Sequence, residues 1–275
     1  MIPPIANNFV AGETPSAALD HVEELNARGV KGILNLLGEH YEDRADADAD
    51  ADAYIELAEG IADRGVDACI SVKPSQIGLE VGDTAFEENL ARIVEAADCF
   101  VWVDMEDHDT VDVTLDAFER HAEATDGNVG VCVQANLKRT GDILERLADS
   151  PGKVRLVKGA YDPPKAIAYK EKSKVDEMYR EYLTYMFEHF EDGIAVGSHD
   201  PAMIDLAKEL HAEHGTPFEI QMLTGVRESA QFELAEEYEV YQYIPYGSKW
   251  FSYFYRRIRE RKANALFALR AVVGS

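Results

Sequence analysis

The segment from residue 243 to residue 260 carries side chains that could bind a small organic acid. It begins as a strand that ends in a turn, and a helical pattern follows at once. One face of that helix presents four side chains at spacings of three and four: Tyr253, Arg256, Arg257 and Glu260. Two adjacent arginines can hold a carboxylate in bidentate fashion. The segment therefore predicts recognition of an amino acid or another organic acid.

Several apolar runs earlier in the chain end in polar side chains, which is unusual for buried strands. The polar residues at these ends include Lys73, Asp104, Gln134, Arg155, Lys158, His199, Asp200 and Gln221. Burying such groups without partners is costly, so a bound ligand with many acceptors is the economical explanation. Arg155 and Lys158 are three residues apart, and both reach one ligand only if the strand ends between them.

Each of these residues also has a purely structural interpretation. Lys73 and Asp104 could form an ion pair near the ends of their strands. Gln134 and Gln221 could satisfy backbone groups of loops. His199 could cap the helix that starts two residues later, although its neighbour is the better N-cap residue. The two arginines of the last helix could be ordinary surface residues, since further basic residues follow them.

The elements that would position these side chains alternate along the whole chain. We expect strands at Gly32–Leu37, Ala68–Lys73, Phe100–Met105, Val129–Asn136, Val154–Tyr161, Ile194–His199, Phe218–Leu223 and Val240–Pro245. We expect helices at Ala17–Arg28, Phe86–Ala97, Leu115–Ala124, Val175–Phe190, Ala202–His214 and Glu228–Glu237. Eight strands that alternate with helices predict an α/β fold, a (βα)8 TIM-like barrel, rather than an open doubly wound sheet.

The chain of 275 residues fits one barrel domain over residues 1–275. We expect an N-terminal helical extension in about 1–30 and a C-terminal helix in about 248–272. The alternating Asp and Ala of Asp43–Tyr54 lack the glycine and the terminal glutamate of a calcium loop, so a solvated acidic loop or helix start is the simpler interpretation. No metal site is expected.

Charge and cysteine content restrict the partners and the compartment. Against 27 Lys and Arg stand 52 Asp and Glu, a net charge of -25, which repels nucleic acid and anionic membranes. Adaptation to high salt is the simplest cause, because screening removes the cost of self-repulsion. The three cysteines lie in apolar runs without metal spacing and indicate a reducing cytoplasm. We see no signal peptide and no membrane span, and the apolar tail Ala263–Val273 could cap the barrel or dock peripherally at the inner face of the membrane.

No nucleophile elbow, Walker loop, Gly-rich dinucleotide fingerprint or His-pair metal motif is present. A phosphate site would therefore be built from Arg155, Lys158 and loop amides.

Several segments, taken in order, make the chain resemble the proline dehydrogenase family from about Lys73 to Asn264. They are Val72–Ser75, Gln134–Thr140, Arg155–Tyr161, Phe218–Leu223 and Tyr243–Gly247, with Arg256, Arg257 and Glu260.

The resemblance implies a stand-alone, FAD-dependent barrel enzyme, in an acidic, halophile-like version, that oxidises L-proline to Δ1-pyrroline-5-carboxylate in proline catabolism. The positions expected to bind FAD are Asp104, Met105, Gln134, Arg155, Lys158, Gly159, Ala160, Gly197, His199, Asp200 and Gln221. Those expected to bind substrate are Lys73, Tyr161, Leu223, Tyr243, Arg256, Arg257 and Glu260. Of all these, Lys73, Asp104, Tyr243, Arg256 and Arg257 are the expected catalytic residues.

By the same resemblance, a hydride passes from C5 of proline to flavin N5, and the electrons leave for a quinone or another acceptor. Three positions depart from the family pattern: Asp200 replaces Asn, Asp162 replaces an aromatic residue and Asn136 replaces Tyr. These departures bear on fine specificity more than on the reaction. Tyr243 would crowd a ring hydroxyl, which favours proline over hydroxyproline. The sequence does not indicate the oligomeric state.

Other functions remain open from the sequence alone. Lys158 at a strand end would also suit a Schiff-base aldolase, which would bind no flavin. A third interpretation, a non-catalytic barrel that binds small acids, leaves the polar strand ends largely unexplained. Another flavin barrel, such as methylenetetrahydrofolate reductase, shares the expected architecture.

Overall fold

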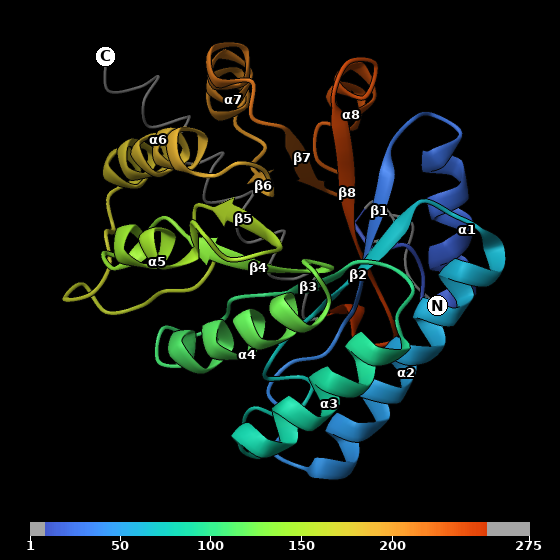
Figure 1. Ribbon diagram of the computed structural model, residues 1–275. Coiled ribbons are helices and arrows are strands. Elements are labelled where there is room, and N and C mark those ends of the chain that lie inside the picture. Colours follow the sequence, from blue (N-terminus) through green and yellow to red (C-terminus); the bar gives the residue numbers. More distant parts are fainter. Residues whose placement is uncertain (1–8, 252–275) are drawn as a thin grey trace, which may run out of the picture.

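A closed barrel of eight parallel strands forms the centre of the computed structural model, which describes residues 9–251 (Figure 1). Each strand pairs with its neighbour in sequence, and β8 pairs with β1 to close the barrel. The strands are β1 (Lys31–Leu36), β2 (Ala68–Val72), β3 (Val101–Val103), β4 (Val129–Gln134), β5 (Lys153–Val157), β6 (Ile194–Gly197), β7 (Phe218–Leu223) and β8 (Glu239–Tyr246). The predicted (βα)8 barrel is confirmed.

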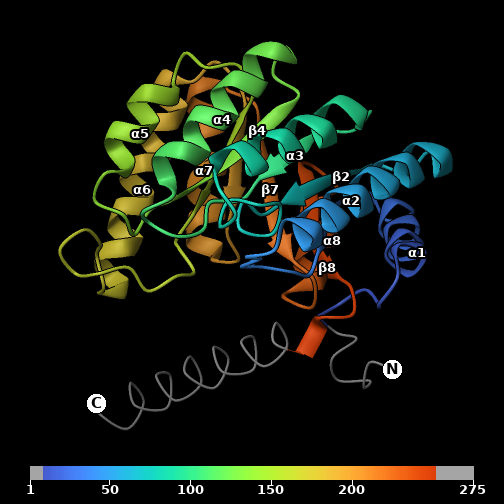
Figure 2. The ribbon, with the colours of Figure 1, turned by 90° about the horizontal axis from the view of Figure 1, so that it is seen from below.

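Helices surround the strands in both views of the molecule (Figures 1 and 2). They are α1 (Pro15–Asn26), α2 (Arg44–Arg64), α3 (Asp83–Ala96), α4 (Val111–Ala124), α5 (Thr140–Leu147), α6 (Lys172–His189), α7 (Pro201–His214) and α8 (Glu228–Leu234). Helix α1 lies within the predicted N-terminal extension. The predicted helix at about 248–272 lies almost wholly outside the described residues.

Helices α2 and α5 were not among the periodic segments identified from the sequence. The alternating Asp and Ala of α2 hide its apolar stripe, which consists of small alanines followed by Tyr54, Leu57 and Ile61. The structure makes the Asp-rich run the first half of a long helix, with Asp43 as its N-cap residue, so of the two predicted alternatives the helix start is confirmed and the loop is not. Helix α5 has eight residues, too few for a clear repeat.

Six strands end before the predicted boundary, and the difference falls where the site residues lie. Strand β5, for example, ends at Val157 instead of Tyr161, and β4 ends at Gln134 instead of Asn136. The backbone therefore leaves the barrel just as the polar side chains begin.

Among the described residues, no helix combines the length and the apolar character that crossing a membrane requires.

The barrel interior holds a small apolar cluster that is separate from the core between strands and helices. Its buried members are Ile33, Cys69, Trp102 and Ala195, and Phe100, Tyr241 and Tyr243 pack against it. Of the cysteines, Cys69 and Cys132 are buried, whereas Cys99 is only partly buried. Burial raises the pKa of the Cys99 thiol to about 11, so it stays protonated at neutral pH.

Helix α2 is joined to the ends of β1 and β2 by a buried hydroxyl. The Tyr54 hydroxyl donates to the Ser71 carbonyl at 2.9 Å, and the Asn35 amide donates to both groups, at 3.2 Å to the hydroxyl and 2.8 Å to the carbonyl. Tyr54 and Asn35 are almost fully buried. A helix built largely from Asp and Ala is thereby fixed at the end of the barrel that carries the polar side chains.

Replacing this hydroxyl tests its contribution to stability. We expect Tyr54→Phe to lower the free energy of unfolding by about 1 to 2 kcal/mol, because buried polar groups lose a hydrogen-bond partner. Urea denaturation measures the change. The control is Tyr185→Phe on α6, whose hydroxyl has no hydrogen bond to another described residue. Equal stability of the two variants would contradict the proposed contribution of the Tyr54 hydroxyl to the packing of α2 on the barrel.

Candidate active site

The carboxyl ends of the strands surround a cavity of about 290 Å³. Its lining contains every predicted site residue within the described range except Asp200. These are Lys73, Asp104, Met105, Gln134, Arg155, Lys158, Gly159, Ala160, Tyr161, Gly197, His199, Gln221, Leu223 and Tyr243. The sequence did not single out four further lining residues: Asn35, Cys132, Val157 and Met222. The polar strand ends and the family resemblance together thus pointed to this cavity.

Arg155 lines the cavity and is 4% exposed. Its guanidinium forms an ion pair with Asp104 and donates to Gln221 Oε1 at 3.0 Å. The Tyr243 hydroxyl donates to the second oxygen of Asp104 at 2.7 Å. Burial lowers the pKa of Arg155, but the Asp104 carboxylate more than offsets this, so the pKa is raised and the charge is kept. Burial, followed by Asp104, raises the pKa of Tyr243 well above its usual range, so this hydroxyl remains a donor.

Lys73 does not form the ion pair with Asp104 that the sequence allowed. Its ammonium donates to the Gly38 carbonyl at 3.4 Å and lies 3.8 Å from Glu39 Oε2. The lysine side chain is 9% exposed. It therefore presents a nearly buried positive charge at the rim formed by the loop after β1.

Glu106 is a buried carboxylate that the list of candidate site residues missed, although it directly follows the third predicted strand. Its oxygens accept from the Ser75 backbone amide at 2.8 Å, from the Ser75 hydroxyl at 3.0 Å and from the Tyr161 hydroxyl at 3.4 Å. Burial raises the pKa of Glu106, against the opposing effect of these donors. Glu106 thereby connects the turn after Lys73 to Tyr161 in the cavity wall.

Lys158 follows the last residue of β5, so Arg155 and Lys158 can both reach the cavity, as the sequence required. Its ammonium lies between Asp176 Oδ1 at 2.5 Å and Asp200 Oδ2 at 2.7 Å. Asp200 also accepts from the Ala202 amide as the N-cap residue of α7. The hydrogen bond from Lys158 lowers the pKa of Asp200. Asp200 does not line the cavity, so it orients Lys158.

Gln134 retains hydrogen-bonding capacity toward the cavity. Its amide nitrogen donates to the Glu106 carbonyl at 2.8 Å, so the interpretation as a backbone partner holds for one half of the amide. Its buried Oε1 has no hydrogen-bond partner among residues 9–251. An unpaired buried acceptor is costly, so this oxygen suits an N–H donor of a ligand.

Glycine is required at position 159 for the cavity wall to form. Gly159 has a φ of 107°, and a Cβ there would lie 2.4 Å from the side chain of Asn136.

His199 also lines the cavity, and its carbonyl accepts from Arg227 at 2.6 Å. The predicted substrate residues Arg256, Arg257 and Glu260 lie outside the described residues.

This arrangement fits a nucleotide with an extended ring system. Arg155 and Lys158 supply positive charge for phosphate or polar ring atoms, and Gln134 supplies an acceptor. Tyr161, Leu223 and Tyr243 add aromatic and apolar surface.

Comparison with known proteins gives a consistent family. A family model described as proline dehydrogenase matches residues 18–270. The chain is 35% identical to proline dehydrogenase 1 of Bacillus subtilis subsp. natto and 37% identical to proline dehydrogenase of Deinococcus radiodurans. Both alignments cover 98% of this chain and 90% of the relative.

Solved structures share the fold. Proline utilization A (PutA) of Bdellovibrio bacteriovorus superposes with a TM-score of 0.83 at 22% identity, covering 92% of this chain and 32% of that chain. PutA of Corynebacterium freiburgense gives 0.80 at 23% identity, covering 95% and 31%. The chain thus spans about a third of the length of these PutA chains.

The buried Glu106 carboxylate predicts a pH-dependent change in stability. Its pKa in the folded protein is raised above the unfolded value of about 4.3. The stability that Glu106 contributes to the folded protein is therefore present in full below the unfolded pKa, and it is lost as the pH rises through the folded pKa. Glu106→Gln removes this titration and keeps an acceptor for the Ser75 amide.

We therefore expect the unfolding free energy of Glu106→Gln, minus that of the wild type, to be more positive at pH 7 than at pH 4. Urea denaturation across this range measures the difference. A difference that stays constant or falls with rising pH would show that burial does not penalise the Glu106 carboxylate.

Proposed function

Because the chain belongs to the proline dehydrogenase family and is an enzyme that oxidises proline, we propose that its cavity holds FAD and L-proline. The product is Δ1-pyrroline-5-carboxylate. The C5–H bond of proline breaks, the C5–N bond becomes a double bond, and the amine proton is lost to solvent. The observation that carries this proposal is the grouping of buried cations, an unpaired amide oxygen and an apolar wall in one cavity.

The cofactor site uses groups that the fold already fixes. FAD, when bound, supplies the two-electron acceptor that takes the hydride from C5 of proline. Arg155 is held by Asp104 and Gln221, and Lys158 by two carboxylates, so both cations are pre-organised for polar groups of the cofactor. Gln134 Oε1 would accept from an N–H of the ring system. Met105, Gly159, Ala160, Gly197 and His199 complete this part of the cavity lining.

The substrate part lies along the aromatic wall. Tyr161, Leu223 and Tyr243 would enclose the proline ring and exclude water from C5. Lys73 would contribute a positive charge at the rim. We assign the binding of the proline carboxylate to Arg256 and Arg257, with Glu260, from their spacing and the family resemblance.

The substrate amine must lose its proton before hydride leaves C5, because the nitrogen lone pair forms the new double bond. Activity should therefore rise as the pH becomes alkaline. We assign the role of final electron acceptor to a quinone or another carrier. Hydroxyproline would be the poorer substrate, because Tyr243 in the cavity wall would crowd a ring hydroxyl.

No observation favours the alternative of a Schiff-base aldolase. Such an enzyme needs a neutral lysine as nucleophile. Lys158 instead lies between two carboxylates, at 2.5 Å and 2.7 Å, which both accept hydrogen bonds from its side-chain nitrogen. A lysine held in this way suits an anionic ligand better than attack on a carbonyl.

The direct test is the visible spectrum of the purified, FAD-loaded protein before and after anaerobic addition of L-proline. We expect flavin bands that bleach when proline is added. Bands that persist would keep the cofactor and remove proline as substrate. A protein that takes up no FAD, and that borohydride links to a carbonyl substrate, would replace the proposal by the aldolase.

Replacing Lys158 tests the cofactor site. We expect Lys158→Met to weaken FAD binding by about 10- to 100-fold, since a charge-assisted contact contributes about 1.5–3 kcal/mol. The matched control is Lys174→Met, which removes an exposed lysine that pairs with Glu177 on α6. Titration with FAD, followed by flavin fluorescence, measures both. Equal affinities of the two variants would remove Lys158 from the site.

A further inference from the structure

A line of hydrogen-bonded side chains runs through the barrel interior from the candidate active site to the opposite end. From Arg155 it continues through Gln221 to Glu219, whose Oε1 accepts from Gln221 Nε2 at 2.6 Å. The other oxygen of Glu219 forms an ion pair with Lys153. Positive and negative groups thus alternate along the line, from Lys153 through Glu219 to Arg155.

The strands dictate this line. Lys153 and Arg155 are two residues apart on β5, as are Glu219 and Gln221 on β7, so each pair points to the same side of its strand. The register places Ala195 of β6 level with Arg155 on one side and Glu219 on the other. Its small side chain leaves room for the longer ones to meet in front of β6.

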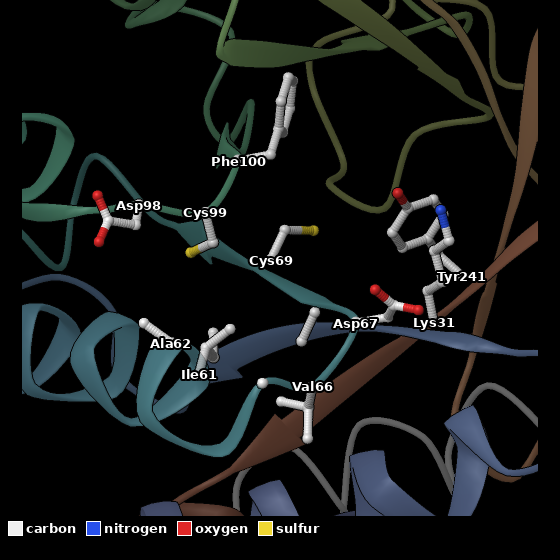
Figure 3. A pocket seen from close by; sticks show the side chains of 12 residues that line it. Lys31, Ile61, Ala62, Val66, Asp67, Cys69, Asp98, Cys99, Phe100 and Tyr241 are labelled. Carbon is white, nitrogen blue, oxygen red and sulfur yellow. The ribbon is translucent and has the colours of Figure 1, made fainter.

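Glu219 does not line the candidate active site. It lines a hollow at the amino ends of the strands, together with Lys153 and Glu239. Figure 3 shows the neighbouring hollow of about 300 Å³ at this end, with Lys31, Cys69, Phe100 and Tyr241 around it. The Lys153 ammonium lies 5.3 Å from the Phe100 ring centroid and 6.0 Å from that of Tyr241. Gln221, which does line the cavity, links Glu219 to it.

The chemistry of the three groups fixes the orientation of the Gln221 amide. A carboxylate can only accept, so Glu219 requires the amide nitrogen. A guanidinium can only donate, so Arg155 requires the amide oxygen. Both demands agree, and the amide has one satisfied orientation. Glu219 is 2% exposed and Gln221 is 4% exposed, so water does not compete for these bonds.

We propose that Glu219 is a positioning residue of the candidate active site, which orients the Gln221 amide and thereby holds the Arg155 guanidinium in place for the cofactor. The inference rests on the proposed FAD site. Without Glu219, the Gln221 nitrogen would be a buried donor with no acceptor, and the amide could rotate. A rotated amide would turn a donor toward Arg155, and the guanidinium would lose its hydrogen bond to Gln221, keeping Asp104 and a 3.5 Å contact with Ser71 Oγ as hydrogen-bond partners in the described residues.

The alternative is that Glu219 serves only as the counter-ion of Lys153. Two substitutions separate the roles. Glu219→Leu removes both the acceptor for Gln221 and the charge, whereas Glu219→Gln removes the charge but keeps a carbonyl that can accept from Gln221. Lys153 is 32% exposed and can turn toward water in both variants.

We expect Glu219→Leu to weaken FAD binding about tenfold, which corresponds to the loss of about one hydrogen bond, and to shift the flavin absorption bands. Glu219→Gln should bind FAD within about threefold of the wild type, with unshifted bands. The control is Glu239→Gln, a more exposed carboxylate at the same end of the barrel that pairs with Lys31 at 2.6 Å. It should match the wild type.

A double variant shows whether the effect passes through Gln221. In a Gln221→Leu background, Glu219→Leu should cause no further loss of FAD affinity. A further tenfold loss there, or unchanged binding and bands for the single variant Glu219→Leu, would overturn the inference. If Glu219→Leu does not fold, Glu219→Gln decides. Weakened FAD binding with shifted bands in that folded variant would assign the effect to charge alone and overturn the inference.

A measurement without the cofactor separates this inference from the proposed function. Before FAD is added, the side-chain nitrogen NMR signals of Arg155, assigned with Arg155→Lys, should shift in Glu219→Leu and stay unchanged in Glu239→Gln. Unmoved signals in Glu219→Leu would contradict the inference even if the wild type binds FAD. A wild type that takes up no FAD would contradict the proposed function and leave the NMR result as the test of the Arg155 geometry.

Discussion

The ion pair of Arg155 with Asp104 is the interaction on which the rest of the site depends. A guanidinium that is 4% exposed would cost several kcal/mol in the barrel interior without a partner. Asp104 supplies the opposite charge, and Tyr243 holds the second carboxylate oxygen. The Trp102 ring lies 4.8 Å from the guanidinium carbon. Removing one partner would leave a buried charge, so we regard the network as one unit that shapes the cavity floor.

The closed barrel explains how such a unit can be built from distant parts of the chain. Its strands are parallel, so all eight carboxyl ends meet at one mouth, where residues of β5, β7 and β8 converge with Asp104, which directly follows β3. The parallel strands also place the hydrogen-bonded side chains that run from Arg155 to Lys153 inside the barrel, because alternate residues of β5 and β7 face the interior. Lys158 lies just beyond β5, where it is held by carboxylates from α6 and the start of α7. The strands thus position the buried charge of Arg155, and helices α6 and α7 orient the more exposed Lys158.

The sequence predicted the barrel and most of the cavity, because strand alternation and polar strand ends are local signals. Helix α2 was missed, since its Asp and Ala residues hide its apolar stripe. The partner of Asp104 was not predicted, because the sequence offered Lys73 and only the folded barrel brings Arg155 to this carboxylate. Glu219 was passed over as well, since its role depends on contacts across β6. The assignment of Arg256, Arg257 and Glu260 still rests on their spacing and the family resemblance.

The central claim is that proline gives up the hydrogen on C5 at this cavity. The most direct measurement is the rate at which the FAD-loaded protein bleaches under anaerobic conditions with ordinary L-proline and with L-proline that carries deuterium at C5. If breakage of the C5–H bond accompanies reduction, bleaching should be several-fold slower with the deuterated substrate. Equal rates for the two substrates, together with slower bleaching when deuterium is placed at C2 instead, would contradict the proposed orientation of proline in the cavity.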